Sequence, residues 1–327
     1  QHEKNRPMLS LKKFALHIEK KIQCRLKKNT KNTPPRVVVE LTNRCNFNCP
    51  FCLVGQQNSQ DSVAHADLKR QFGDIELSLV QKIVVDAKAF GMTEILLTFQ
   101  GEPLLHPQVA EFIRISRKAG LKTIIFTNGY LLKPEFSRKL IRSGLNSILF
   151  SVDGASDDSY RQNRSGGKFN KVYQNMNDMS QLARDENSKI NIIWQFIVLR
   201  NNEHEVETAR KMADAIGVKF QPKTFAESVP ELKAKNPQYQ RKLLNKPCRD
   251  LVRAMWVYWN GDVVPCCYDL TGKEILGNVK NESLQEIWYN QRYTSFRNRI
   301  DEAVVHTNNE PELCKGCLKW RLPEKAA

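Results

Sequence analysis

Three cysteines within eight residues constrain this chain more than any other feature. They are spaced C-x3-C-x2-C, from Cys45 through Cys49 to Cys52, directly after the largely apolar run 37–41. Thiolates at this spacing can hold three corners of an iron–sulfur cube, and because no fourth cysteine lies nearby, one iron stays open to an exogenous ligand. A structural zinc site is the alternative, but such a site normally closes its tetrahedron with a nearby Cys or His, and the nearest downstream histidine is His65.

The cysteine loop resembles the signature of the radical S-adenosylmethionine (SAM) superfamily. Phe51, just before the third cysteine, lies where that family usually carries an aromatic residue. The resemblance implies a [4Fe–4S] cluster whose open iron chelates the amino and carboxylate groups of SAM. It also implies the activity: an electron from the cluster cleaves SAM to methionine and a 5′-deoxyadenosyl radical, which removes a hydrogen atom from an unactivated C–H bond.

Length and composition fit a large α/β domain with an appended module. The 327 residues are 41% hydrophobic, which is enough for a sizeable core, and no run of 18 apolar residues could span a membrane. No secretion-signal pattern is present, and nine cysteines in short-spaced clusters fit metal ligation in a reducing compartment better than a disulfide framework. We therefore expect a cytoplasmic protein.

The formal charge of +16 is concentrated near the N-terminus, where residues 1–34 hold ten Lys and Arg against two Asp and Glu. Apolar residues recur there at helical spacing, which predicts a basic amphipathic helix. These residues are Leu11, Phe14, Ile18, Ile22 and Leu26. The simplest expectation is that the helix docks on the main domain. Contact with an anionic membrane surface, or with an acidic electron donor such as flavodoxin or ferredoxin, is the alternative.

Residues 35–225 alternate strand-like and helix-like segments, the pattern of βα units around a parallel sheet. Strands are expected at 36–41, 94–99, 123–127, 147–152, 191–198 and 218–221. Helices are expected at 79–90, 107–119, 134–143, 171–183 and 203–216, with Gly91, Gly120, Gly144 and Gly217 just past helix ends. Six units are too few for a closed eight-stranded barrel. The resemblance implies a partial (βα)6 barrel with its chemistry at the carboxyl ends of the strands.

Candidate SAM-binding residues follow these strands. The segment Gln100-Gly101-Glu102-Pro103 resembles the family's G-G-E-P motif, with Gln in place of the first Gly. The resemblance implies that Gly101 and Glu102 meet the methionine amino group of SAM. Taken alone, such a tetrapeptide would be an ordinary turn. The other positions that resemble SAM contacts are Thr127, Asn128, Ser151, Asp153, Arg164, Gln195 and Leu199.

Four of these positions carry more specific expectations. Residues 164–167 resemble an Arg-then-Gly pattern of related enzymes, and the resemblance implies that the Arg164 guanidinium binds the SAM carboxylate, with Arg161 as its competitor. Asp153 is expected either to lie beside SAM or to shape the turn after the fourth strand. Gln195 is expected to point into the barrel and Leu199 to lie near the adenine, although apolar strand residues usually belong to the core.

A second cysteine group follows the barrel, in residues 226–327. Its four expected metal ligands are Cys248, Cys266, Cys314 and Cys317. Together with a G-x4-C hairpin that begins at Gly261 and a helix expected at 283–288, they resemble the SPASM/twitch extension of radical SAM proteins. Four thiolates suffice for one auxiliary [4Fe–4S] cluster. Zinc bound by the same thiolates is the alternative.

The resemblance implies radical chemistry and leaves the substrate open. An auxiliary cluster held entirely by protein can accept a second electron, which gives a net oxidation such as alcohol to ketone. Cys267, which the four-ligand count leaves spare, could instead return a hydrogen atom to the substrate and give epimerisation. We expect a dehydrogenase or epimerase of a small polar substrate such as a sugar or aminocyclitol. The alternatives are a peptide-modifying maturase and a non-catalytic metal-binding scaffold.

Overall fold

The computed structural model describes residues 33–58, 70–225, 230–240, 248, 250–305 and 311–314. The basic helix expected in residues 1–34 lies almost wholly outside this part of the chain, and so does the expected metal ligand Cys317. No helix among the described residues is long and apolar enough to cross a membrane.

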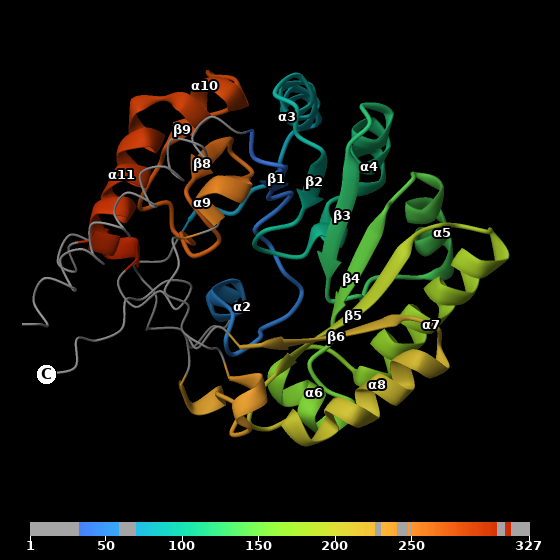
Figure 1. Ribbon diagram of the computed structural model, residues 1–327. Helices are drawn as coiled ribbons and strands as arrows, with labels where there is room; N and C mark the ends of the chain where they lie inside the picture. The colour runs from blue at the N-terminus through green and yellow to red at the C-terminus, as the bar shows by residue number, and fades with distance from the viewer. Residues whose placement is uncertain are drawn as a thin grey trace, which may run out of the picture.

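One sheet runs through the described residues, in the strand order β6-β5-β4-β3-β2-β1-β7-β8-β9 (Figure 1). The strands from β6 to β7 are parallel, whereas β8 and β9 pair antiparallel. The order does not close on itself, so the sheet forms the open partial barrel that the sequence predicts. The strands are β1 Arg36–Val39, β2 Glu94–Leu97, β3 Lys122–Thr127, β4 Ser147–Ser151, β5 Asn191–Val198, β6 Lys219–Thr224, β7 Ala254–Val257, β8 Asp262–Val264 and β9 Gly277–Asn278.

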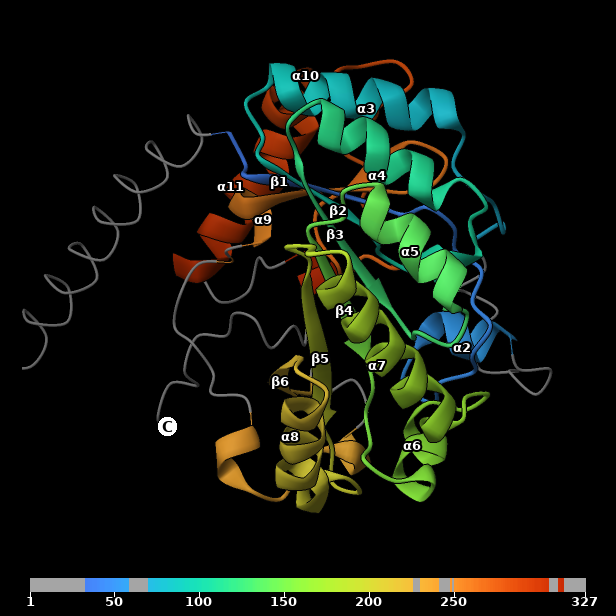
Figure 2. The same cartoon turned by 90° about the vertical axis from the view of Figure 1, so that its right-hand side faces the viewer.

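Helices cover one face of the parallel strands, with α3, α4, α5 and α7 in succession over that face (Figure 2). The helices are α2 Leu53–Asn58, α3 Leu77–Ala89, α4 Val109–Lys118, α5 Pro134–Arg142, α6 Asp157–Asn163, α7 Phe169–Asp185, α8 Val206–Ala215, α9 Asp250–Arg253, α10 Leu284–Tyr289 and α11 Gln291–Val305. Short 3-10 turns lie at Pro103–Leu105, Glu203–Glu205, Pro230–Leu232, Pro237–Tyr239 and Glu312–Cys314. The four glycines predicted to end helices all have positive φ, between +71° and +86°.

The two faces of the sheet pack differently because successive side chains of a strand point to opposite sides. In β1, Val37 and Val39 belong to the large core beneath the helices. Val38 belongs to a separate small cluster on the other face, with Leu96 and Ala254. Partly buried side chains pack against this small cluster: Phe99, Ile124, Phe126 and Trp256. We call this second face the lumen of the partial barrel.

Most predicted strands and helices exist, and their ends differ by a few residues. The sixth strand continues to Thr224 because it pairs with β5 as far as Val198. The first two strands end at Val39 and Leu97, earlier than predicted, where the chain leaves the sheet to form the loops at its carboxyl edge. Helices α2, α6, α9 and α11 were not predicted.

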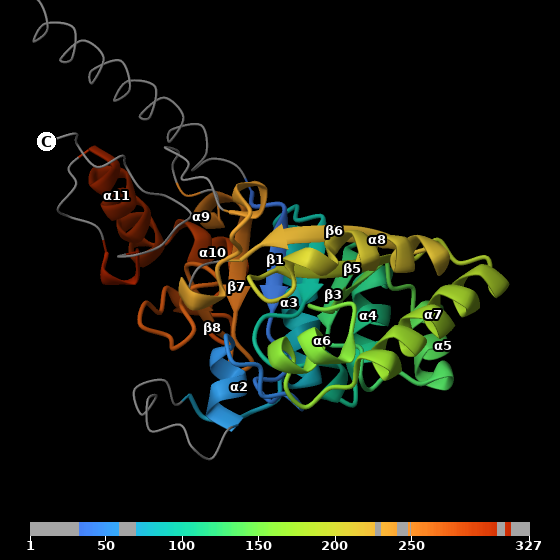
Figure 3. The same ribbon diagram turned by 90° about the horizontal axis from the view of Figure 1, so that it is seen from below.

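A seventh parallel strand is the main structural feature that the sequence analysis missed. Strand β7 pairs with β1 from Arg36 opposite Ala254 to Val39 opposite Val257. The C-terminal segment therefore continues the sheet of the barrel. Figure 3 shows its elements β8, α10 and α11 at the end of the molecule opposite α7. The apolar run of residues 254–257 was the available signal.

Candidate metal centres

The cysteine loop leaves the carboxyl end of β1, and a second segment pins its base. The Asn43 side chain donates to the backbone oxygen of Gln71 (2.8 Å) and accepts from the backbone N–H of Gly73 (2.9 Å). The Thr42 hydroxyl donates to the backbone oxygen of Gly73 (3.2 Å). Segments 42–44 and 70–74 therefore hold the two ends of the loop together.

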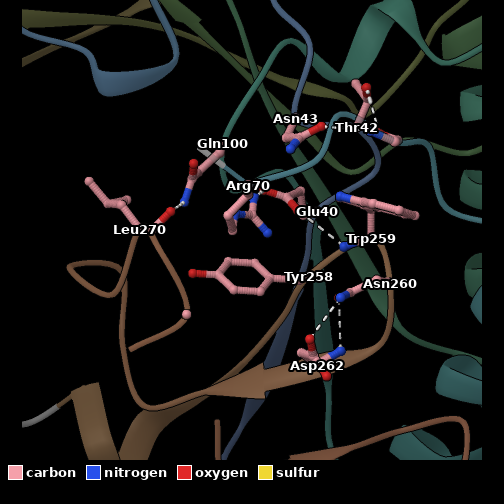
Figure 4. A network of polar contacts seen from close by, with 12 residues as sticks. Glu40, Thr42, Asn43, Arg70, Gln100, Tyr258, Trp259, Asn260, Asp262 and Leu270 are labelled. Atoms are coloured by element: carbon pink, nitrogen blue, oxygen red, sulfur yellow. Dashed lines mark hydrogen bonds and ion pairs between the residues drawn. The ribbon is translucent and has the colours of Figure 1, made fainter. Parts of the chain in front are cut away.

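Glu40 joins this base to the C-terminal module. Its fully buried carboxylate pairs with Arg70 at 2.5 Å and accepts from the backbone N–H of Trp259 at 3.1 Å. The Arg70 guanidinium also lies over the Tyr258 ring, 3.5 Å from its centroid (Figure 4). Burial raises the pKa of Glu40, and Arg70 opposes that shift. One carboxylate thus connects β1, the return of the cysteine loop and the hairpin after β7.

The thiols of the loop are buried or half-buried. Burial raises the pKa of Cys45 to about 12 and also raises the pKa of Cys49. Across the described residues, no group of three or more His, Cys, Asp or Glu side chains stands in a metal-holding arrangement. The donor set nevertheless fits an iron–sulfur cluster, because three thiols share one loop and the Arg164 guanidinium lies 3.9 Å from the Cys49 sulfur, where a cation favours thiolate.

Arg164 is the predicted arginine that the structure brings to the cysteine loop. It forms a buried ion pair with Asp153 (2.6 Å) and lies over the Phe51 ring, 5.4 Å from its centroid. Burial lowers the pKa of Arg164, but the negative charge of the Asp153 carboxylate more than offsets this effect. The pKa of Arg164 is therefore raised overall. Its competitor Arg161 is exposed and pairs with a neighbour on its own helix. Asp153 also accepts from the backbone N–H of Ile197 (2.7 Å), so it shapes the turn after β4.

Phe51 connects the cysteine loop to the segment after β6, at the open side of the sheet. Its ring contacts that of Phe225, which follows β6, edge to face at a centroid distance of 5.7 Å. The loop that begins after β1 therefore reaches the far edge strand, and the three cysteines lie over the carboxyl ends of the strands. This is the location that the resemblance implied.

Glu102 lies beside the cysteine loop, and its buried carboxylate accepts three hydrogen bonds. The donors are the backbone N–H of Leu104 (3.1 Å), the Thr127 hydroxyl (2.7 Å) and the backbone N–H of Asn128 (2.7 Å). Burial raises the pKa of Glu102 to about 6 against these hydrogen bonds. The Asn128 side chain in turn donates to Asn46 on the loop (2.9 Å). A carboxylate has about four acceptor positions, so a further donor can still bind.

Gly101 approaches the backbone of the cysteine loop so closely that no side chain fits. Its φ is +73°, and a Cβ atom there would lie 2.4 Å from the Thr42 carbonyl oxygen and 2.6 Å from that of Arg44. The next residue, Glu102, donates its backbone N–H to the Arg44 oxygen (2.8 Å). The close approach that this glycine permits is therefore to the loop itself.

The remaining predicted SAM contacts occupy the β4 and β5 region. Ser151 and Gln195 are in register and face the lumen. Gln195 is 7% exposed, and its Oε1 accepts no hydrogen bond from the residues described. A buried oxygen of this kind fits a bound ligand that donates to it. Leu199 is fully buried just past β5. The SAM contacts assigned to these residues stay predictions.

The second cysteine group is assembled from separate segments. Cys248, Cys266, Cys267 and Cys314 are all half-buried, and Cys317 lies outside the described residues. Burial raises the pKa of Cys266, and negative charge on Cys267 and Cys248 adds to that shift. The Cys267 sulfur lies 3.9 Å from an Asp250 carboxylate oxygen.

Asp269 organises the loop that follows Cys266 and Cys267. Its buried carboxylate accepts three successive backbone N–H groups from residues 272–274, at 2.8 to 2.9 Å. Its backbone oxygen accepts from the Tyr258 hydroxyl at 2.5 Å. Glu40, Arg70 and Asp269 were not predicted from the sequence as residues that support the two sites. A charged residue within the otherwise apolar run 37–41 was the one available signal.

Two family models match the segments that carry these two cysteine groups. Residues 39–213 match the family model of the radical SAM superfamily, and residues 248–318 match the SPASM iron–sulfur cluster-binding domain. The chain belongs to the radical SAM superfamily. A SAM-binding [4Fe–4S] cluster, SAM itself and auxiliary iron–sulfur ligation follow from these two matches.

Several curated proteins are similar to this radical SAM protein. The tungsten-containing aldehyde ferredoxin oxidoreductase cofactor-modifying protein of Pyrococcus furiosus is 26% identical, over 79% of this chain and 82% of the relative. The S-adenosyl-L-methionine-dependent 2-deoxy-scyllo-inosamine dehydrogenase of Niallia circulans is 22% identical, over 86% and 91%. The AdoMet-dependent heme synthase of Methanosarcina barkeri is 31% identical, over 39% and 34%. The chain thus spans from about a third to about nine tenths of these relatives.

Solved structures show the same fold. BtrN in complex with AdoMet and 2-DOIA superposes with a TM-score of 0.57 at 21% identity, covering 88% of this chain and 93% of that chain. Streptococcus suis SuiB bound to S-adenosylmethionine superposes with a TM-score of 0.67 at 15% identity, covering 93% and 76%.

Proposed function

We propose that this radical SAM protein is a dehydrogenase that oxidises a hydroxyl-bearing carbon of a small polar ring, such as an aminocyclitol or sugar, to a ketone. When bound at Cys45, Cys49 and Cys52, the cluster with SAM supplies the 5′-deoxyadenosyl radical that removes a hydrogen atom from that carbon. Formation of the ketone then requires the loss of one more electron and one proton. We assign the electron to the auxiliary site at Cys248, Cys266, Cys314 and Cys317.

One observation carries the proposal: both cysteine sites are attached to one continuous sheet. The first follows β1, and Cys266 of the second follows β8, while β1 and β8 both pair with β7. Glu40 ties the base of the first site to the backbone of Trp259 in the β7–β8 hairpin. A hydrogen-abstraction site and an electron-accepting site are thereby held in a fixed relation. The similarity to an inosamine dehydrogenase over most of both chains supports the same substrate class.

Within this proposal, the residues beside the cysteine loop bind SAM. We assign the methionine carboxylate to Arg164, whose guanidinium has five donors, and the methionine amino group to Glu102. Asp153 is a positioning residue, because its ion pair with Arg164 fixes the guanidinium against the loop. Gln195 and Ser151 face the lumen, where the nucleoside part of SAM would lie.

The test is anaerobic turnover of the reconstituted protein with dithionite, SAM and 2-deoxy-scyllo-inosamine. The proposal predicts one 5′-deoxyadenosine for each ketone formed. Release of 5′-deoxyadenosine without a ketone would show that the protein cleaves SAM but that 2-deoxy-scyllo-inosamine is not its substrate. A peptide maturase would instead act on a peptide, and a scaffold would bind metal without cleaving SAM.

Epimerisation is the second candidate, and the position of Cys267 favours it. The thiol is adjacent to an assigned ligand and lies 3.9 Å from the Asp250 carboxylate. After the hydrogen atom is given, an electron from the auxiliary site and a proton relayed by Asp250 would restore the thiol. Turnover in deuterium oxide separates the two outcomes. A thiol exchanges with solvent, so epimerisation would place deuterium at the inverted carbon, whereas oxidation yields a ketone without it.

The cellular setting follows from the same chemistry. A reducing cytoplasm would preserve the clustered thiols, and a flavodoxin- or ferredoxin-like protein would supply the electron that starts each turnover. Reduction by either purified donor in place of dithionite is the test of that partner.

A further inference from the structure

The lumen contains a buried hydrogen-bond donor with no role in the chemistry above. Trp256 lies on β7 opposite Val38 of β1, and both belong to the lumen cluster. Its indole Nε1 is buried and donates no hydrogen bond to the residues described. Buried donors in native proteins are nearly always paired, so this N–H is suited to an acceptor that the protein does not itself provide.

Phe99 extends the indole into an aromatic wall. The two rings lie 4.9 Å apart between centroids, tilted by 54°. Phe99 also stacks on Tyr258 at 5.4 Å with an interplanar angle of 17°. Tyr258 is held from elsewhere, by its hydrogen bond to Asp269 and by the Arg70 guanidinium over its ring. Tyr258 therefore supports the wall formed by Phe99 and Trp256 on one side, while both rings of the wall remain partly exposed.

The strands at the other end of the parallel sheet give the lumen a polar side. Gln195 of β5 is in register with Gln221 of β6, and the buried Oε1 of Gln195 is an unpaired acceptor in the part of the chain that the structure describes. Lys223 faces the same side, with its ammonium 5.6 Å from the centroid of the Phe126 ring. The lumen thus has an aromatic wall that carries one N–H and a wall of amides and an ammonium.

We propose that Trp256 is a substrate-recognition residue, whose indole N–H donates to a hydroxyl oxygen of a saturated, polyhydroxylated ring while Phe99 packs on the C–H face of that ring. Such a ring has apolar C–H faces and a hydroxylated rim. The pair matches it because Phe99 provides an apolar face and the Trp256 indole edge provides a hydrogen-bond donor. The inference rests on the proposed function and assigns the residue that selects its substrate.

The test measures binding without turnover. Trp256→Phe keeps an apolar ring and deletes the N–H. Trp288→Phe is the matched control, since its Nε1 is also buried without a partner among the described residues, but its ring packs against Arg297 in the C-terminal core. Calorimetric titration of oxidised, cluster-loaded protein with 2-deoxy-scyllo-inosamine, in the presence of SAM, gives the dissociation constant. We expect Trp256→Phe to weaken binding roughly 3- to 10-fold, with no change for Trp288→Phe and no change in the affinity for SAM.

Ring analogues that each lack one hydroxyl sharpen the test. Wild-type protein should lose affinity for the analogue without the bound hydroxyl, and Trp256→Phe should bind that analogue as well as it binds the parent ring. Equal binding of the parent by wild type and Trp256→Phe would overturn the inference. Failure of wild type to bind any ring would overturn both the inference and the substrate class. Formation of 5′-deoxyadenosine, measured separately, tests the radical chemistry alone.

Discussion

The two metal centres of this protein are built in opposite ways. The first takes its three thiols from eight consecutive residues on one loop, whose base is pinned by Asn43 and Glu40. The second takes its assigned thiols from segments as far apart as Cys248 and Cys317. The first is therefore a local structure placed on a sheet edge, whereas the second exists only once the hairpin and helices of the C-terminal module have packed.

The same contrast appears in the residues that support each centre. Arg164, just past α6, and Glu102, in the segment after β2, contact the first loop and its base. Beside the second centre, the Asp269 carboxylate accepts backbone N–H groups of its own loop. Glu40 and Arg70 are the exception, because they contact both regions. Substitutions should thus damage one centre alone unless they fall on this bridge.

The largest effect is expected from Cys49→Ala. Loss of one of three ligands should release the first cluster, so iron falls by about four atoms per chain and formation of 5′-deoxyadenosine falls to background. Circular dichroism should be unchanged because the loop lies at the edge of the sheet. Continued SAM cleavage at the wild-type rate would refute the assignment of the first centre.

Cys266→Ala should damage the second centre while sparing the first. Iron should again fall by about four atoms per chain, SAM cleavage should persist, and ketone formation should stop because the electron acceptor is lost. Metal analysis of the wild type supplies the competing result. One equivalent of zinc beside a single cluster would overturn the auxiliary iron site.

Arg70→Met should lower the free energy of unfolding, because Arg70 and Glu40 connect the regions of both centres. It leaves the fully buried Glu40 carboxylate without its cation, which typically costs about 3–5 kcal/mol of folding free energy. Arg138→Met is the control, because Arg138 is partly exposed and its partner Glu186 also pairs with Arg142, so the change should cost about 1 kcal/mol or less. Urea unfolding measures both. Equal losses would show that the bridge does not stabilise the protein.

Gly101→Ala should disrupt the first centre alone. The new Cβ would overlap the carbonyl oxygens of Thr42 and Arg44, so the cysteine loop must move, and the positive φ adds strain of about 1–3 kcal/mol. Gly120→Ala has a similar φ of +81°, but its nearest neighbouring atom is the Lys88 ammonium nitrogen at 3.5 Å. We therefore expect iron loss for Gly101→Ala only. Full iron in both variants would contradict the close approach at Gly101.

The smallest effect is expected from Cys267→Ala. If the protein is a dehydrogenase, the ketone should be formed at an unchanged ratio to 5′-deoxyadenosine, with a modest loss of stability from the missing packing. Mass spectrometry of product formed in deuterium oxide decides the matter, because inversion through a solvent-exchanged thiol adds one deuterium and oxidation to a ketone does not. Loss of an inverted product, with SAM cleavage intact, would instead identify Cys267 as a hydrogen-atom donor.

The sequence revealed features that depend on local spacing. The cysteine loop, the six barrel strands and the glycines after helices each follow from residues close together in the chain. The pairing of β7 with β1 was missed because it joins residues about 220 positions apart, and a short apolar run does not specify its neighbour. The contacts that Arg70 makes with Glu40 and Tyr258 are likewise tertiary.

The site residues show the same limit. The motif identified Gly101 and Glu102 as important, yet sequence could not show that the glycine faces the loop backbone or that three protein donors already occupy the carboxylate. Residue type indicates which chemistry is available, and folding determines which partner uses it.

The central claim is that the cysteine loop and the barrel together cleave SAM. The most direct measurement is chromatography of a reaction containing anaerobically reconstituted protein, dithionite and SAM. We expect equal amounts of 5′-deoxyadenosine and methionine, formed by the wild type and absent from the variant in which Cys45, Cys49 and Cys52 are all alanine. No 5′-deoxyadenosine from wild-type protein that carries its full iron content would contradict it.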